Sequence, residues 1–260
     1  MDLKLNGKVA IVTGASKGIG RGIATELARE GMSLVIAARS ESQLESLAIE
    51  LRGQAGAVMV HAADLSQPDA PAAMVATTVA KFGRIDLLVN NAGATKRGDF
   101  LSLSEEDWHQ GYALKFFAAV RATRAAWPHL VAVGGSVVNI AGVGGRTGHA
   151  EFTIGGSVNA AMLNLTKSLS DRAVAEGVRV NAINPGSIMT DRLVTRLQRL
   201  ADEGKFDLDE AAKRMASHQG IARFGTVEEI AGAVAFLASE RGAYLNGAVI
   251  DIDGGMTRTL

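Results

Sequence analysis

The sequence predicts an α/β domain in which a parallel β-sheet is covered by helices on both faces. Short apolar runs alternate with helical patterns along the chain, which is typical of strand–helix–strand units. Most of these runs are continuously apolar rather than alternating, as expected for strands that are buried on both faces. No Pro- or Ser-rich linker divides the chain and no repeat of solenoid length is present, so we expect one domain over residues 1–260.

Seven runs are expected to form strands, and five longer patterns are expected to form helices. The expected strands are residues 9–13, 34–38, 57–61, 85–89, 136–140, 178–183 and 248–252. The expected helices are residues 18–30, 41–52, 69–82, 105–127 and 157–176. Pro128 favours an end for the long fourth helix, and Gly31 and Gly177 favour ends for the first and the fifth. Right-handed crossovers with a switch point between the first and fourth strands predict the strand order 3-2-1-4-5-6-7.

Residues 189–220 depart from this alternation because they are polar and helical in pattern and lie between two strands. An insertion at the carboxyl end of a strand is well placed to cover a ligand, so we expect this segment to be a substrate lid. Arginines such as Arg192 and Arg196 would suit an acidic substrate. Carboxylates such as Asp191 and Asp202 roughly cancel their charge, which leaves the substrate class open.

The composition excludes several classes of function. Lys+Arg and Asp+Glu both number 27, and this balance disfavours nucleic acid or a membrane surface as a partner. The absence of cysteine excludes a disulfide framework, a thiol nucleophile and a thiolate metal site, and we expect no metal. The longest apolar stretch, residues 230–238, is far shorter than the roughly 20 residues of a membrane span. Residues 1–8 lead directly into a strand and do not resemble a signal peptide, so we expect a cytoplasmic protein.

A glycine-rich turn joins the first strand to the first helix. It reads Thr13-Gly14-Ala-Ser16-Lys17-Gly18-Ile19-Gly20. Glycines allow the backbone to approach a pyrophosphate, and the start of the helix offers free N–H donors and the positive end of its dipole. The turn therefore predicts dinucleotide binding, the alternative being a tight turn without a ligand.

The spacing of this turn resembles that of the short-chain dehydrogenase/reductase family, and the resemblance covers essentially the whole chain. Other stretches agree: Asp64 after the third strand, Asn90-Asn91-Ala92-Gly93 after the fourth, Asn184-Pro185-Gly186 after the sixth, and residues 251–255 near the end. The resemblance implies a single Rossmann-like doubly wound domain with a seven-stranded parallel sheet. It also implies a homotetramer or a homodimer, with interfaces on the long helices and the C-terminal strand.

The resemblance implies a set of cofactor-binding residues, all of which except Asn159 belong to the motifs or follow a strand. They are Gly14, Ser16, Lys17, Gly18, Ile19, Gly20, Arg39, Asp64, Leu65, Asn91, Ala92, Gly93, Asn159, Pro185, Gly186 and Thr190. In the family, the acidic residue at position 64 contacts the adenine, and the segment at 185–190 meets the nicotinamide. Asn90 matches a residue that ties the central strands together, so we expect it to be structural.

The end of the second strand predicts which cofactor is preferred. An NAD-preferring relative would place a carboxylate there to hold the ribose 2′-hydroxyl, whereas this chain has Ala38 followed by Arg39. A guanidinium suits a 2′-phosphate, and Lys17 lies on the same side. We therefore expect NADP rather than NAD, unless Arg39 is only a solvated residue at the start of a helix.

The catalytic set of the family, a Ser, a Tyr and a Lys, is missing. Alignment outward from Val138-Asn139-Ile140 places Gly142, Gly155 and Asn159 at these three positions. Because small residues stand where a tyrosine and a lysine would be, we expect an open cleft beside the nicotinamide, with Asn159 still able to bond a ribose hydroxyl.

Three residues are candidates for the missing proton donor. Lys115 stands where the family often has an asparagine, and His149 and Glu151 lie in the loop before the fifth expected helix. Each has an ordinary alternative, namely a helix surface or interface residue for Lys115 and a surface or packing residue for His149. Water, or no acid at all, remains a further alternative.

Three functions are compatible with these observations. The first is an NADP-dependent oxidoreductase that acts on a carbonyl or alcohol with a non-standard active site. The second is a catalytically inactive dinucleotide-binding protein, such as a sensor or a scaffold. The third is a non-redox enzyme that uses the same cleft for a small-molecule substrate. The intact cofactor motifs favour the first two.

Overall fold

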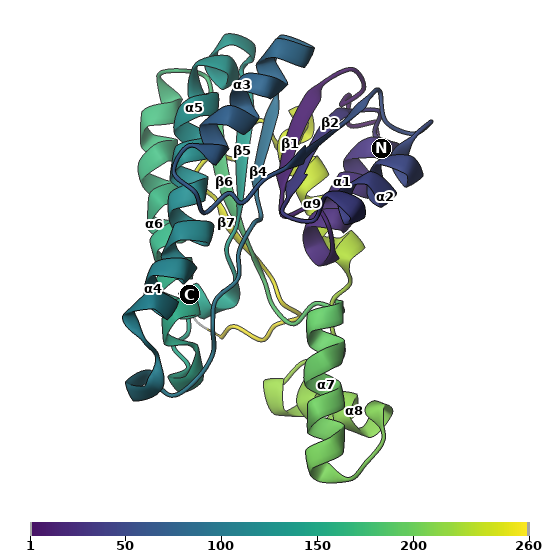
Figure 1. The fold of residues 1–260 in the computed structure, drawn as a ribbon, viewed down its shortest axis with the longest axis vertical. Helices are drawn as coiled ribbons and strands as arrows, with labels where there is room; N and C mark the ends of the chain where they lie inside the picture. The colour runs from purple at the N-terminus through teal and green to yellow at the C-terminus, as the bar shows by residue number, and fades with distance from the viewer. Residues whose placement is uncertain (1, 259–260) are drawn as a thin grey trace.

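The seven predicted strands are all present and form one parallel sheet. They are β1 (Val9–Thr13), β2 (Ser33–Ala38), β3 (Val58–Ala62), β4 (Leu87–Asn90), β5 (Ser136–Ile140), β6 (Arg179–Pro185) and β7 (Val249–Ile252). Their order is β3-β2-β1-β4-β5-β6-β7, as predicted, in a computed structural model that describes residues 2–258 (Figure 1). The switch point therefore lies between β1 and β4, where ligands bind in open α/β sheets.

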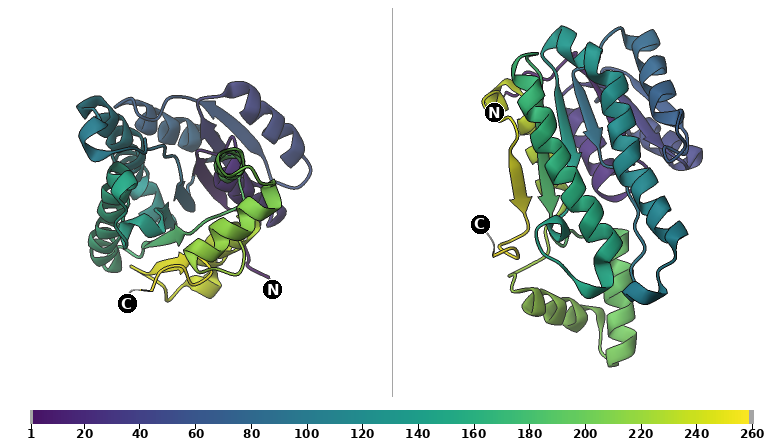
Figure 2. Two further views of the ribbon diagram at one scale, coloured as in Figure 1. Left: turned by 90° about the horizontal axis from the view of Figure 1, so that it is seen from below. Right: turned by 90° about the vertical axis from the view of Figure 1, so that its left-hand side faces the viewer.

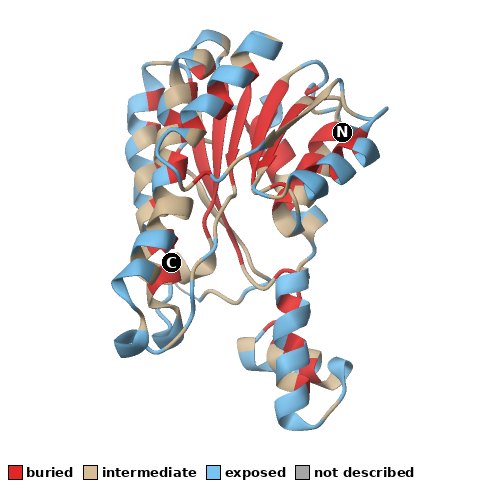
Figure 3. Ribbon diagram, in the orientation of Figure 1, coloured by how far each residue is buried: buried red, intermediate tan, exposed pale blue. Residues whose placement is uncertain are grey.

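Helices cover both faces of the sheet. They are α1 (Gly18–Arg29), α2 (Glu41–Leu51), α3 (Ala70–Phe82), α4 (Glu105–Tyr112), α5 (Ala118–Val133), α6 (Thr153–Val174), α7 (Asp191–Gly204), α8 (Leu208–Gln219) and α9 (Val227–Ala238). One core packs α1, α2 and α9 against one face of the sheet. The other core packs α3, α5 and α6 against the opposite face (Figure 2). Buried strands between these two layers explain the continuously apolar runs (Figure 3).

Two helix boundaries differ from the sequence-based expectation. Pro128 lies inside α5, which continues to Val133 and ends at Gly134 in the left-handed conformation, φ +63°. The helix tolerates the proline because Ala126 and Leu130, on either side of it, are buried in the core and hold the backbone in place. The helix expected from residue 157 begins at Thr153, and Ser157 bonds back to the carbonyl of Thr153 within it.

The long helical region before β5 is not a continuous α-helix. Between α4 and α5, residues Ala113–Phe117 form a turn of π-helix. Such π turns shift the following side chains around the helix axis and often occur at functional sites. This turn contains Lys115.

The expected lid, residues 189–220, forms the helical hairpin α7–α8, which extends beyond the carboxyl ends of the strands (Figure 1). Its small core is formed by Leu193, Leu197 and Ala201 of α7, Ala211 and Ala216 of α8, and neighbouring apolar residues. At its base, the two connecting segments pair with each other, because Met189 N donates to Gly225 O at 2.8 Å and Gly225 N donates to Ser187 O at 3.0 Å. The hairpin is thus an appendage with its own core on a fixed base.

Among residues 2–258, no helix is both long and apolar enough to cross a lipid bilayer.

Candidate active site

The turn after β1 has the geometry that a close ligand approach requires. Gly14 and Gly18 adopt positive φ values of +68° and +56°, which favour glycine. A Cβ on Gly20 would lie 2.2 Å from the carbonyl oxygen of Gly14, so no side chain fits there. The side chain of Lys17, which precedes α1, makes no capping hydrogen bond to the start of that helix. The first backbone N–H groups of α1 therefore remain available to a phosphate, and the turn fits a dinucleotide.

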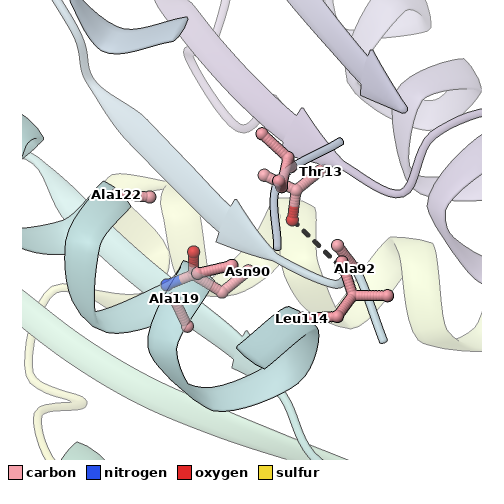
Figure 4. A pocket seen from close by; sticks show the side chains of 8 residues that line it. Thr13, Asn90, Ala92, Leu114, Ala119 and Ala122 are labelled. Atoms are coloured by element: carbon pink, nitrogen blue, oxygen red, sulfur yellow. Dashed lines mark hydrogen bonds between the residues drawn. The ribbon is translucent and has the colours of Figure 1, made fainter. Parts of the chain in front are cut away.

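Side chains at the end of β4 hold this turn in place. Thr13 Oγ1 accepts hydrogen bonds from Asn91 N at 2.9 Å and from Ala92 N at 3.0 Å (Figure 4). Asn91 Nδ2 donates to the carbonyl oxygen of Thr13 at 2.9 Å. The side-chain amide of Asn91, which was expected to bind the cofactor, therefore holds the turn in place. In β4 itself, Asn90 Nδ2 donates to Asn139 Oδ1 of β5 at 2.9 Å, which confirms its expected structural role.

A small cavity of about 10 Å³ lies behind these residues, between β4 and α5 (Figure 4). Leu65 lines this cavity and is buried in the core, so it lies behind the cofactor side of the sheet rather than on its surface. Because the cavity holds at most about one water molecule, it is not a substrate site.

Arg39 and Asp64 lie close together after the adjacent strands β2 and β3. Asp64 Oδ1 accepts hydrogen bonds from Ser66 Oγ at 2.8 Å and Ser66 N at 3.0 Å. These bonds, with a smaller contribution from the charge of Arg39, lower the pKa of Asp64. Within residues 2–258, Arg39 is exposed and pairs with no carboxylate within 4 Å, so its guanidinium is available to a ligand.

The segment after β6 meets the glycine-rich turn. Thr190 precedes α7, and its Cγ2 lies 3.5 Å from the Cβ position of Gly18. Gly186 packs against Asp253, because a Cβ added at position 186 would lie 2.7 Å from the Cβ of Asp253. The sequence therefore identified segments from both sides of the switch point that the fold brings together.

Lys115 lies between the ends of β4 and β5. Its Nζ donates to the carbonyl oxygen of Ala141 at 2.7 Å, and its aliphatic chain crosses Gly93, where a Cβ would lie 2.9 Å from Lys115 Cδ. Burial of the amino group, with a smaller effect of the nearby Arg192, lowers the pKa of Lys115 to about 8. An amine in this range can both give and take a proton near neutral pH.

The open cleft expected around Gly142, Gly155 and Asn159 does not form, because Phe152 fills it. A Cβ on Gly155 would lie 2.1 Å from two ring atoms of Phe152. Gly144 also faces this ring, since a Cβ on Gly144 would lie 2.9 Å from the nearest ring atom of Phe152. The phenyl ring therefore takes the space into which a side chain at position 155 would extend.

Asn159 is buried rather than exposed to a cofactor. It is 3% exposed, and its Nδ2 lies 2.9 Å from the Cβ position of Gly142. Its Oδ1 has no hydrogen-bond partner among the described residues. A bond to a ribose hydroxyl would require the loop at 142–145 to move away.

The two loop candidates lie at the surface. His149 is exposed, and its Nδ1 accepts a hydrogen bond from Glu151 N at 3.2 Å, which begins a single turn of 3₁₀-helix at Ala150–Phe152. Glu151 is also exposed; burial lowers the pKa of Arg97, and the charge of Glu151 partly opposes this. Within residues 2–258, neither His149 nor Glu151 forms a hydrogen bond with Lys115, whose Nζ bonds to Ala141 O instead.

Sequence analysis missed two residues at this site, Phe152 and Arg97. The Cζ of Arg97 lies 4.1 Å from the centre of the Phe152 ring, in a cation–π contact. Gly98 N donates to Glu151 O at 3.2 Å and so holds the two loops together. The available signal was position, because Arg97 follows the end of a central strand, where loops carry function.

Comparisons with known proteins agree with this geometry. A family model described as enoyl-(acyl carrier protein) reductase matches residues 14–257. A 3-oxoacyl-[acyl-carrier-protein] reductase of Thermotoga maritima is 32% identical over 258 residues, which are 98% of this chain and 99% of the relative. The crystal structure of L-sorbose reductase from Gluconobacter frateurii, complexed with NADPH and L-sorbose, has a TM-score of 0.96 and 33% identity, and 100% of each chain is covered. That of YwfH, an NADPH-dependent reductase involved in bacilysin biosynthesis, has a TM-score of 0.91 and 31% identity over 98% of this chain and 100% of the other.

Proposed function

Because the chain belongs to the short-chain dehydrogenase/reductase family, we propose that it is an NADP(H)-dependent oxidoreductase with an altered proton-donating site. It would interconvert a carbonyl compound and an alcohol. The observation that carries the proposal is the place of Lys115, which joins the ends of β4 and β5. The altered site is itself part of the proposal, because it rests on the alignment of Gly155 and Asn159 with the family's tyrosine and lysine.

The residues present fit NADP(H). The glycine-rich turn and the first N–H groups of α1 would hold the diphosphate, and the exposed Arg39 would hold the 2′-phosphate. Thr190, next to Gly18, would hold the nicotinamide end. NADP(H), when bound, supplies or accepts a hydride. The similar structures named for NADPH support the same choice.

Lys115 would supply the proton. In reduction, the protonated Nζ gives a proton to the carbonyl oxygen of the substrate as the carbonyl carbon gains a hydride, so that an alcohol forms. In oxidation, neutral Nζ takes the hydroxyl proton back. The pKa of about 8 suits both directions. His149 and Glu151 are the alternative donors, and their use would require the loop at 149–151 to turn inward.

One observation favours a second function, that of a dinucleotide-binding protein without turnover. Phe152 fills the place of the usual tyrosine side chain and has no group that transfers a proton. The purified protein would then bind NADP(H) without reducing aldehydes or ketones and without oxidising alcohols. A screen of these compounds for a change in nicotinamide absorbance distinguishes the two functions.

Arg39→Ala tests the cofactor assignment. We expect the variant to lose about 10- to 100-fold in NADPH affinity, since a charge-assisted contact to phosphate contributes about 1.5–3 kcal/mol, while NADH affinity stays within about twofold. Titration of nicotinamide fluorescence with both cofactors gives the two affinities. An unchanged ratio of NADPH to NADH affinity would show that Arg39 does not contact the 2′-phosphate.

Lys115→Met tests the proton donor. We expect reduction to slow by about 10²- to 10⁴-fold, the usual contribution of a placed acid, and by more than in His149→Ala or Glu151→Gln. The wild-type reduction rate should fall as the pH rises through about 8, because the donor loses its proton, and the variant should lack this transition. Turnover comparable to wild type would assign the donor to the loop. Loss of NADPH binding as well would assign Lys115 to the ribose.

A further inference from the structure

Three arginines from two separate segments lie close enough to influence one another or Lys115 electrostatically. Arg97 lies in the loop after β4, and Arg192 and Arg196 lie one turn apart on α7 of the lid. The guanidinium of Arg97 lies within electrostatic range of both lid arginines, and Arg192 lies within range of the amino group of Lys115. The lid and the body of the protein therefore present positive charge to each other.

Arg97 is held in a way that leaves its hydrogen-bond donors free. Its guanidinium stacks on Phe152, 4.1 Å from the ring centre, and the Gly98–Glu151 backbone bond fixes the loop beneath it. Stacking uses the flat face of the guanidinium and leaves the N–H groups at its edge pointing outward. The ring that supports it is the one that fills the space beside Gly155.

The carboxylates of the lid do not neutralise these arginines. Glu203 pairs with Arg199 at 2.8 Å, Glu210 pairs with Arg214 at 2.7 Å, and Asp207 caps α8. Within residues 2–258, Arg97, Arg192 and Arg196 form no ion pair within 4 Å. Among the described residues, the near charge balance of residues 189–220 thus does not place a carboxylate within 4 Å of Arg192 or Arg196.

Around Arg97, one carboxylate opposes the charges of the two lid arginines. Partial burial and then the charge of Arg196 lower the pKa of Arg97, Glu151 opposes them, and Arg192 adds a smaller lowering. Bringing like charges together costs free energy unless an anion lies between them. One carboxylate does not balance three guanidiniums and the nearby Lys115.

We propose that Arg97, Arg192 and Arg196 bind an anionic group, a carboxylate or a phosphoryl group, on the carbonyl substrate of this enzyme. The inference rests on the proposed reductase function and names its substrate class. An anion held between the loop and α7 would draw the lid toward the body and leave the carbonyl beside Lys115. The diphosphate of the cofactor is the competing anion for Arg192, because Arg192 lies two residues after Thr190, at the cofactor side of α7. Arg196 lies one turn farther along α7 and so farther from the cofactor.

Matched pairs of charged and uncharged ligands test the proposal on the protein saturated with NADP⁺. The pairs are 4-oxopentanoate with its methyl ester, and dihydroxyacetone phosphate with dihydroxyacetone. Titration calorimetry on the NADP⁺ complex gives each affinity without turnover. A separate assay with NADPH in place of NADP⁺ follows NADPH oxidation and gives each kcat/KM. We expect at least one charged member to bind about tenfold or more tightly than its uncharged partner. The pair that shows this preference tells whether the anion is a carboxylate or a phosphoryl group.

Variants assign the preference to the arginines. Arg97→Gln combined with Arg196→Gln should abolish the tenfold preference, with NADPH affinity and binding of the uncharged ligands unchanged. Glu151→Gln should strengthen anion binding, because it removes the opposing charge. Lys213→Gln removes one positive charge elsewhere on the hairpin, from a cation of α8 with no ion pair among the described residues, and should have no effect.

Three results would overturn the proposal. The first is equal affinity for the charged and uncharged members of both pairs. The second is a preference for the charged ligand that persists in the double variant. The third is a loss of NADPH affinity in that variant as large as its loss of anion affinity. Failure of the reductase function gives a different result, in which anions bind with the expected preference but no nicotinamide is oxidised.

Discussion

Gly155 and Phe152 form a closely fitted pair at the start of α6. The Cβ position of Gly155 lies 2.1 Å from the Phe152 ring, and the guanidinium of Arg97 stacks over the same ring. Any side chain at 155 must displace the ring and with it the support of Arg97. At this point of the chain, glycine is therefore required by packing, since its backbone does not have a positive φ.

Substitutions at these two positions should depend on each other. Gly155→Ala alone should lower the free energy of unfolding by about 1–3 kcal/mol, the usual cost of overpacking. In a Phe152→Ala background, the same change should be neutral or stabilising by up to about 1 kcal/mol, because alanine favours the helix over glycine. Chemical denaturation of the four proteins of this cycle measures the coupling. Additive effects would show that the ring does not occupy the space beside Gly155.

Lys115 should make stability depend on pH. Its pKa is lowered from 10.5 to about 8 in the folded protein, so between these values the unfolded chain binds more protons and stability rises with pH. Lys115→Met should therefore stabilise the protein at pH 7, by roughly 1–3 kcal/mol since the side chain is only partly shielded from water. This gain should shrink as the pH rises from about 8 to 10.5. Urea denaturation at pH 7, 8.5 and 10 checks the trend, and a gain that is constant with pH would contradict it.

The residues of the site divide into those that the sequence predicts and those that it does not. The glycine-rich turn, Arg39 and Thr190 follow strand ends, so their places depend on chain order alone. Phe152 was missed because its role depends on how one ring packs across a loop. Asn159 was assigned to the cofactor because its register in α6 is clear, yet the loop at 142–145 covers it.

At the scale of elements, the central strands were predictable because buried parallel strands are continuously apolar. The edge strands β3 and β7 are only partly buried and were predictable from their place in the strand–helix alternation. The helix ends were less certain, and α5 shows the reason. A proline removes one backbone donor and favours a helix end, but it does so locally. Ala126 and Leu130 pack into the core on either side of Pro128, and this tertiary contact keeps the helix continuous. The π turn before α5 was likewise not visible in the apolar pattern.

Pro128→Ala should stabilise the protein. Pro128 is exposed in the interior of α5, so alanine restores a backbone hydrogen bond without disturbing the core. We expect a gain of about 1–2 kcal/mol in the free energy of unfolding, less than the full helix-propensity difference because proline also restricts the unfolded chain. Pro68→Ala is the matched control, since that proline is also exposed but lies in the turn before α3, outside any helix. Thermal unfolding of both variants measures the difference, and equal effects would contradict the argument.

At the scale of the whole molecule, the sheet and the hairpin have separate tasks. The sheet brings the cofactor motifs to one edge, and α7–α8 extends past that edge with a core of its own (Figure 1). The hairpin can therefore change position without disturbing the buried layers. The pairing of the lid charges was not predictable, because the sequence gives only their near balance and the structure shows which of them form ion pairs.

The face formed by α5 and α6 should join copies of this chain into a dimer or a tetramer. The two helices lie side by side on one side of the molecule (Figure 2), and they expose Val131 and Val174, the latter 74% exposed. Burying such residues against a second copy is favourable by about 25 cal/mol per Å² of apolar surface. Light scattering should give at least twice the 27.1 kDa of one chain, and Val131→Glu with Val174→Glu should reduce it. Ile49→Glu, at a residue of α2 that is 59% exposed on another helix layer, should leave the assembly intact. A wild-type monomer at micromolar concentration would contradict this assignment, because the chain would then form no interface on the face of α5 and α6.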